Sequence, residues 1–155
     1  INSGGRWFGG IDSAIQRVAG NLFHRQAQRA LPLRHGETVI AKSNGKRHEG
    51  KFQNVVFVID DLKGPLHEIV RNGLTAASQS GFKTVSLPTI RMGVVLCVVE
   101  KSKEEAVDEM VKGVAQFLKK SSKTSIENIT FVVYSDPDTL EMLQQKLAAF
   151  LSTRR

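Results

Sequence analysis

The sequence predicts an α/β fold of three layers, α/β/α, in which helices cover both faces of a mixed, largely parallel sheet. Two observations carry this prediction. Apolar residues recur at helical spacing in several segments, and short runs rich in β-branched residues lie between those segments. Such alternation of helix and strand is typical of sheets whose strands are joined by crossover helices. The chain has 155 residues and contains no readable linker, so we expect one domain over residues 1–155.

The first third of the chain is predicted to hold one helix and one strand, followed by a second strand. Apolar residues recur every three or four positions over 12–29, which predicts a helix. A short strand over 38–41 leads into a polar, exposed loop over 42–50. The β-branched run over 55–59 is continuous, which is typical of a strand buried on both faces.

A second helix and a further strand follow. An apolar stripe over 66–77 predicts the helix, and Gly81 is placed to end it. Residues 83–87 then form a strand that ends at Pro88.

Capping signals mark the last two helices. Ser102 and Glu105 have the spacing of a capping box, so a helix should begin there. A strand is predicted over 129–134. Asp136 then caps the last helix, with Pro137 in its first turn.

The net charge of +7 is unevenly distributed. Residues 1–51 carry nine Lys/Arg and three Asp/Glu, a net +6, and the remainder carries a net +1. This imbalance suits a phosphorylated or polyanionic ligand. The alternative is a solvated basic surface.

Other classes of site are not predicted. The longest apolar runs, such as 94–99, are too short to span a membrane. The histidines show no metal-ligand spacing, so we expect no metal. Cys97 lies in an apolar run and is predicted to be a buried, inert thiol. A single cysteine favours a reducing compartment, hence an intracellular protein of the cytoplasm or nucleus.

The opening stretch is the strongest functional signal. A glycine-rich loop ending in Gly9-Gly10 runs into the first helix, with Asn2 before the loop and Asp12 at the start of the helix. Backbone amides freed by glycines, together with the positive end of a helix, form a phosphate site. In α/β sheets ligands bind at the carboxyl ends of strands, where the loop 88–96 and the turn 134–136 are also expected.

These motifs resemble those of the macro domain family. Asn2 falls on the last Asn of the family's first motif, and residues 9–15 fall on its glycine-to-helix segment. Residues 87–90 with Gly93-Val94 resemble the family's second loop, and 131–134 resemble its final strand. The resemblance covers nearly the whole chain, and the ordered set of motifs is more specific than any one of them.

The resemblance implies a ligand and an activity. The ligand is ADP-ribose, free or on an ADP-ribosylated protein, and no cofactor is implied. The activity is hydrolysis of mono-ADP-ribose from a modified protein side chain, by a glycohydrolase or esterase acting on a bond to an acidic residue. A non-catalytic reader of ADP-ribosylated partners is the first alternative. A nucleic-acid-binding module is the second, although few aromatic residues interleave with the basic ones for base stacking.

The resemblance also assigns roles to residues. Asn2 and Asp12 are the catalytic pair: Asn2 would position the distal ribose, and Asp12 would orient the attacking water or the substrate. Tyr134 would stack on adenine. The other ADP-ribose-binding residues come from the glycine loop and the second loop; they are Trp7, Phe8, Gly9, Gly10, Ile11, Pro88, Arg91, Met92, Gly93, Val94 and Val95.

Each assignment has a structural alternative. Asn2 suits a turn, and Asp12 suits a helix N-cap. Trp7 and Phe8 would either stack on the distal ribose or plug the edge of the core. Arg91 would either pair with the diphosphate or remain a solvated surface residue.

Departures from the family pattern bear on catalysis. Val95 stands where the family has an aromatic residue on the distal ribose, and Gln16 replaces a His. Both changes favour the reader. We also expect that the family's first strands, which carry an Asp that reads adenine, are missing ahead of Asn2.

Overall fold

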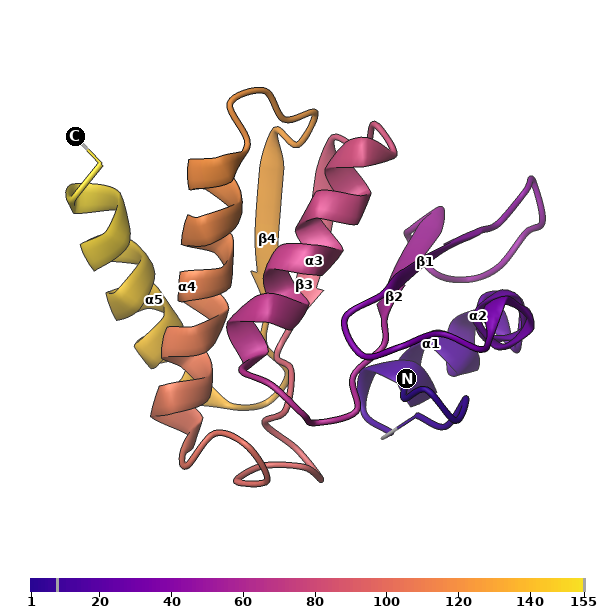
Figure 1. Cartoon of the computed structure of the whole chain (residues 1–155), viewed down its shortest axis with the longest axis horizontal. Coiled ribbons are helices and arrows are strands. Elements are labelled where there is room, and N and C mark those ends of the chain that lie inside the picture. The colour runs from indigo at the N-terminus through magenta and orange to yellow at the C-terminus, as the bar shows by residue number, and fades with distance from the viewer. Residues whose placement is uncertain (8, 155) are drawn as a thin grey trace. The chain divides into compact units, whose positions relative to one another are not determined.

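Helices and strands alternate through most of the chain (Figure 1). The structure is a computed structural model and describes residues 1–7 and 9–154. The elements are α1 (Ile11–Ala19), α2 (His24–Ala30), β1 (Thr38–Lys42), β2 (Asn54–Val58), α3 (Leu66–Gln79), β3 (Thr84–Pro88), α4 (Lys103–Lys120), β4 (Asn128–Val132) and α5 (Pro137–Ser152).

The strands pair within two separate units, Ile1–Lys63 and Gly64–Arg155. In the first unit β1 and β2 run antiparallel, and in the second β3 and β4 run parallel. Among the described strands there is thus one pair of each kind, in two separate two-stranded sheets. The prediction of one domain over 1–155 stays a prediction.

The predicted helix over 12–29 is in fact two helices. Gly20 ends α1 with φ 56° and ψ −144°, and its N–H donates to the Gln16 carbonyl at 2.8 Å. A residue with positive φ cannot continue a right-handed helix, and glycine adopts that conformation readily. Apolar spacing continues past the break because Phe23 and Ala27 return to the same core.

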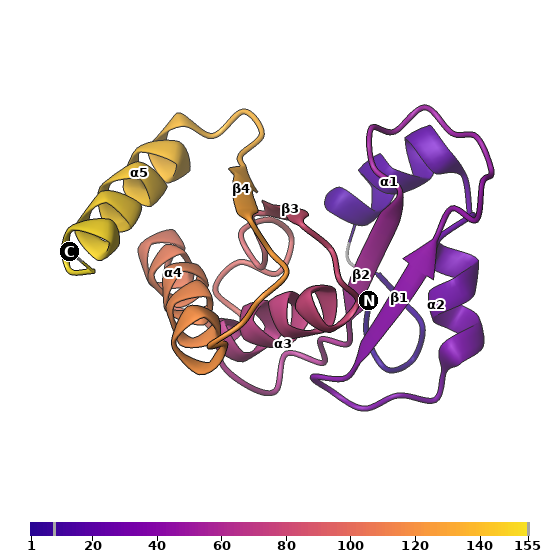
Figure 2. The ribbon, with the colours of Figure 1, turned by 90° about the horizontal axis from the view of Figure 1, so that it is seen from above.

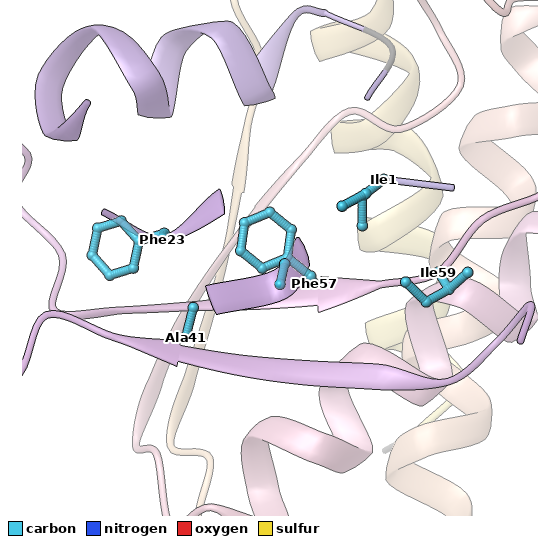
Figure 3. Close-up of a cluster of buried hydrophobic side chains, with 6 residues drawn as sticks. Ile1, Phe23, Ala41, Phe57 and Ile59 are labelled. Carbon is cyan, nitrogen blue, oxygen red and sulfur yellow. The ribbon is translucent and has the colours of Figure 1, made fainter. Parts of the chain in front are cut away.

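The strand predicted over 55–59 is present as β2, but it is not buried on both faces. Phe57 is buried, while Val55, Val56 and Val58 are half-buried. The reason is its antiparallel pairing with β1, which places the core of this unit on one face of the pair (Figure 3). The core residues are Ile1, Phe23, Ala27, Ala41, Phe57 and Ile59.

Gln26 fixes α2 beside β1 (Figure 2). Its amide nitrogen donates to the carbonyls of Lys42 at 2.8 Å and Leu22 at 3.0 Å. Its amide oxygen accepts the N–H of Lys42 at 2.9 Å. The whole side-chain amide is thus used to hold this helix against the end of the strand.

In the second unit, α4 packs against both α3 and α5 (Figure 1). A core of Val107, Val111 and Leu143 lies between α4 and α5. This packing buries the apolar face of α4, whereas Leu143 is the buried apolar residue of α5 and Leu140 stays 46% exposed.

Both predicted caps are confirmed. Ser102 Oγ accepts the N–H of Glu105 at 3.1 Å, and Asp136 Oδ1 accepts the N–H of Thr139 at 3.2 Å. Asp136 also receives a hydrogen bond from Lys103 Nζ at 2.8 Å, which is the main reason that the pKa of Asp136 is lowered to about 2. The cap of α5 is thereby tied to the start of α4.

Gly113 allows α3 and α4 to approach closely. A Cβ at this position would lie 2.7 Å from Val70 Cβ and 2.8 Å from the carbonyl oxygen of His67. Both atoms belong to α3, and one of them is backbone, so neither can move aside easily.

We therefore expect Gly113→Ala to destabilise the protein by about 1–3 kcal/mol, as overpacking does. Helix propensity alone would give the opposite sign, because alanine is favoured over glycine by about 1 kcal/mol in a helix interior. Chemical denaturation measures the difference, with exposed Lys112→Ala as the control. A stabilised Gly113→Ala variant would show that the helices do not pack this closely.

Candidate functional site

The segment that carries Asn2 is held from both sides. The carbonyl of Ile1 accepts the N–H of Asp60 at 2.9 Å. The carboxylate of Asp61 accepts the N–H of Ser3 at 2.8 Å, and this bond is the main reason that the pKa of Asp61 is lowered. Asn2 therefore has a defined position next to the residues that follow β2.

The side chain of Asn2 closes the glycine-rich loop. Its Oδ1 accepts the N–H of Arg6 at 2.9 Å, and its backbone carbonyl accepts the N–H of Gly5 at 3.0 Å. The turn role that the sequence allows is thus confirmed. Oδ1 retains a second lone pair and Nδ2 can donate, so the amide can still bind a hydroxyl, and the ribose-binding role stays a prediction.

The two glycines before α1 are required by backbone conformation. Gly9 has φ 85° and Gly10 has φ 58°, while a Cβ at either position would meet nothing within 4 Å. Gly10 is the N-cap residue of α1, and Ile11 begins the helix with an exposed side chain. First-turn amides of a helix lack intrahelical acceptors, so this loop offers donors to an anion. The predicted ligand residue Phe8 lies outside the described residues.

Asp12 does not cap the helix, so that alternative is wrong. The N-cap is Gly10, with no side-chain hydrogen bond, and Asp12 is the second residue within α1. Its side chain turns to α2 instead, where Oδ1 lies 2.8 Å from His24 Nε2. The residue is only 8% exposed, so this contact occupies a buried carboxylate.

His24 is fully buried, and two aromatic rings pack against its imidazole. The Trp7 ring lies 4.9 Å from the imidazole at 58°, and the Phe57 ring lies 4.9 Å away edge-on. Trp7 is half-buried there, in keeping with the plug interpretation of that residue. Sequence reasoning missed His24 because nothing in a spacing of twelve residues indicates a contact with Asp12. Only the break at Gly20 brings the two helices together.

Arg91 is a buried ion-pair partner, which overturns the solvated alternative. It is 5% exposed, and its Nη1 lies 2.9 Å from Glu100 Oε1 and 2.8 Å from the carbonyl of Gly64. The same Glu100 oxygen accepts the N–H of Leu66 at 2.8 Å, at the start of α3. This pair ties the second loop at Arg91 to Glu100 and to the start of α3, and pairing of Arg91 with a diphosphate stays a prediction.

The other residues of the second loop divide between core and surface. Pro88 is the last residue of β3, and Met92 packs against the core of its unit. Gly93 and Val94 are exposed, Val94 to 87%, while Val95 is half-buried. The tip of the loop therefore presents backbone groups that a ligand can reach.

Tyr134 lies just beyond β4 and is 91% exposed. Because β3 and β4 are parallel, their carboxyl ends meet at one edge of the pair. Tyr134 and the second loop are therefore brought to the same edge. A free aromatic face at this position is what stacking on a base requires.

Cys97 is exposed, so the prediction of a buried thiol is wrong. The apolar run around it forms turns and bends rather than a strand, and Cys97 itself has φ 65°. Its Sγ lies 3.3 Å from the carbonyl oxygen of Lys101.

Over residues 1–7 and 9–154, no cluster of three or more His, Cys, Asp or Glu side chains could hold a metal ion. Within the same residues, no helix is long and apolar enough to cross a membrane.

Part of the basic excess lines a polar pocket of about 380 Å³ in the first unit. Its cationic side chains are Arg25, Arg29 and Lys46, from α2 and the turn after β1. Such a surface attracts anions in general, through long-range electrostatics.

Comparison with known proteins gives matches over most of the chain. The family model described as "Macro domain" matches residues 1–106. An O-acetyl-ADP-ribose deacetylase of Enterobacter cloacae subsp. cloacae is 30% identical over an alignment of 160 positions, which covers 90% of this chain and 78% of the relative.

Solved structures show the same fold. The Trypanosoma brucei macrodomain in complex with ADP-ribose matches with TM-score 0.75 and 19% identity, over 94% of this chain and 60% of that one. The Oceanobacillus iheyensis macrodomain with ADP matches with TM-score 0.72 and 19% identity, over 98% and 82%. The chain thus spans about 60% of the length of the Trypanosoma brucei structure, and the predicted α/β fold class is confirmed.

The buried contact of Asp12 predicts an effect on stability. Asp12→Ala leaves the buried His24 nitrogen without its partner, which should cost about 1–3 kcal/mol. Asp12→Asn keeps an oxygen acceptor and should cost less. Denaturant unfolding measures both, with the exposed neighbour Ser13→Ala as control. Equal stability of Asp12→Ala and the wild type would mean that this contact is not formed.

Proposed function

The chain belongs to the macro domain family, and from that premise we propose that it binds ADP-ribose and hydrolyses mono-ADP-ribose from modified protein side chains. The observation that carries the proposal is the position of Asp12. Its carboxylate lies in the first turn of α1, two residues after Gly10, and is held by a hydrogen bond rather than left mobile. The bacterial relative is named for a substrate that contains ADP-ribose, which supports the choice of ligand.

The binding half of the proposal rests on backbone donors. In the first unit, we assign phosphate binding to the backbone amides around Gly9 and Gly10. In the second unit, we assign a ligand contact to the tip of the second loop, where Gly93 and Val94 are exposed. Amides and a helix start stabilise anions without side-chain charge. This explains how the site can work although Arg91 is occupied by Glu100. Adenine is assigned to the exposed ring of Tyr134.

The chemical half concerns the distal ribose. Water attacks the anomeric carbon, and a new carbon–oxygen bond forms there. The bond from that carbon to the acceptor oxygen breaks, and its electron pair leaves with the acceptor carboxylate. Asp12 orients the water and takes its proton, through the oxygen that His24 does not use. Positive charge that develops on the ribose is stabilised by this carboxylate and by the ligand's own diphosphate.

Two other functions have some support. The half-buried Val95, in place of an aromatic on the ribose, favours a reader that binds without hydrolysis. The basic pocket with Arg25, Arg29 and Lys46 favours nucleic-acid binding. Phosphate-dominated binding to RNA would weaken steeply as salt rises, which separates it from the proposed ligand.

The ligand prediction is that ADP-ribose binds more tightly than AMP, because the second phosphate and ribose add contacts. Tyr134→Ala should weaken ADP-ribose binding by about 1–3 kcal/mol, the range for stacking on a base. Tyr134→Phe should be nearly neutral, since the ring face makes the contact. Isothermal titration calorimetry measures all three. Equal affinity for AMP would contradict the ligand, and an equally large loss in Tyr134→Phe would contradict stacking.

The catalytic prediction is that Asp12→Asn lowers turnover much more than it lowers ADP-ribose affinity. A group that acts mainly in the transition state changes the rate, and its loss here should cost on the order of 100-fold. Asparagine keeps the contact with His24, so the fold is preserved. Release of ADP-ribose from a modified acceptor is the measurement. Full turnover in Asp12→Asn would remove this role, and a wild type that binds without turnover would be a reader.

A further inference from the structure

We propose that His24 is a positioning residue for the reaction: it binds one oxygen of Asp12 and thereby presents the other to the ligand. The inference rests on the proposed function, because it concerns the same carboxylate. No feature of the sequence indicates it, since His24 lies on a different helix from Asp12 and has no motif around it.

The contact is made by one atom on each side. His24 Nε2 lies 2.8 Å from Asp12 Oδ1, which is hydrogen-bond distance, and both residues are buried. A carboxylate has two equivalent oxygens that exchange by rotation about the last side-chain bond. A buried donor on Oδ1 prevents that rotation and leaves Oδ2 as the oxygen available for chemistry.

The surroundings of the imidazole decide which nitrogen carries the proton. Within the described chain, Nδ1 is buried and has no hydrogen-bond partner. A buried N–H without an acceptor is rarer and more costly than a lone pair without a donor. The proton therefore belongs on Nε2, where Asp12 accepts it. This tautomer makes His24 a donor to the carboxylate.

The imidazole cannot swing away from Asp12. Trp7 and Phe57 pack on the ring, each with its centroid 4.9 Å from that of the imidazole. The helix that carries His24 is tied to β1 by the two hydrogen bonds between Gln26 and the backbone of Lys42. A donor held in this way costs no reorganisation when the ligand arrives, which is the advantage of a preorganised site.

Two substitutions separate the hydrogen bond from the packing. His24→Phe keeps a flat ring between Trp7 and Phe57 but removes the donor. His24→Gln loses the ring but keeps an N–H at a similar reach. His48→Phe is the matched control, because His48 also packs against aromatic rings, those of Phe23 and Phe52, and its Nδ1 accepts the N–H of Gly50.

The readouts are kcat and KM for release of ADP-ribose from a modified acceptor, with thermal unfolding in parallel. We expect kcat to fall about 10-fold or more in His24→Phe, with KM changed by less than about 3-fold, because a misplaced catalytic group lowers the rate. His24→Gln should recover most of that loss even if it is the less stable protein. His48→Phe should lower the unfolding temperature without lowering kcat.

Three results would overturn the inference. The first is wild-type kcat in His24→Phe. The second is an equal loss in His24→Gln and His24→Phe, which would indicate a packing role alone. The third comes from proton NMR of the wild type, where the bonded Nε2 proton should give a slowly exchanging downfield signal that Asp12→Ala abolishes. Absence of that signal would show that the bond is not formed.

Failure of the proposed function would look different. A wild type that binds ADP-ribose but never releases it would end the hydrolysis proposal, and the same variants would then be compared by affinity. His24→Phe should bind ADP-ribose more weakly than His24→Gln, and equal affinities would overturn the positioning role. A wild type that neither binds nor hydrolyses would overturn both claims together.

Discussion

The hydrogen bond between Asp12 and His24 is the contact on which the first unit depends. A buried carboxylate is tolerated only with a partner, so α2 must bring His24 back toward the start of α1. The break at Gly20 makes that return possible, and the rings of Trp7 and Phe57 enclose the pair. The glycine loop is thus joined to the hydrophobic core through a polar contact, and Asp12 is placed without the freedom of a surface side chain.

In the second unit, a buried ion pair has a comparable structural role. Arg91 and Glu100 lie in the connection between β3 and α4 and are buried together, and Glu100 also accepts the N–H of Leu66 at the start of α3. Breaking such a pair leaves an uncompensated buried charge, so the loop ends are strongly held. Between them, Gly93, Val94, Cys97 and Val98 are exposed. In both units a buried polar contact fixes a loop whose outer backbone is free to meet a ligand.

Local signals in the sequence were sufficient for much of the fold. The caps at Ser102 and Asp136 involve residues three positions apart, so their patterns could be recognised without tertiary information. The contacts of Asp12 and Arg91 could not, because their partners lie 12 and 9 residues away and no periodicity relates them. The antiparallel pairing of β2 with β1 could not be predicted either, because a β-branched run has the same sequence pattern beside a parallel or an antiparallel neighbour. The family motifs indicated Asn2 and Asp12, yet what each side chain touches became clear only from the structure.

The central claim is that His24 holds Asp12 so that its free oxygen serves the distal ribose. The most direct measurement is a crystal structure of this chain with ADP-ribose bound. We predict that Asp12 Oδ1 stays within hydrogen-bond distance of His24 Nε2, while Oδ2 faces the anomeric carbon or a water beside it. A complex in which the Asp12 carboxylate points away from the ribose, or in which ADP-ribose binds away from the glycine loop, would contradict it.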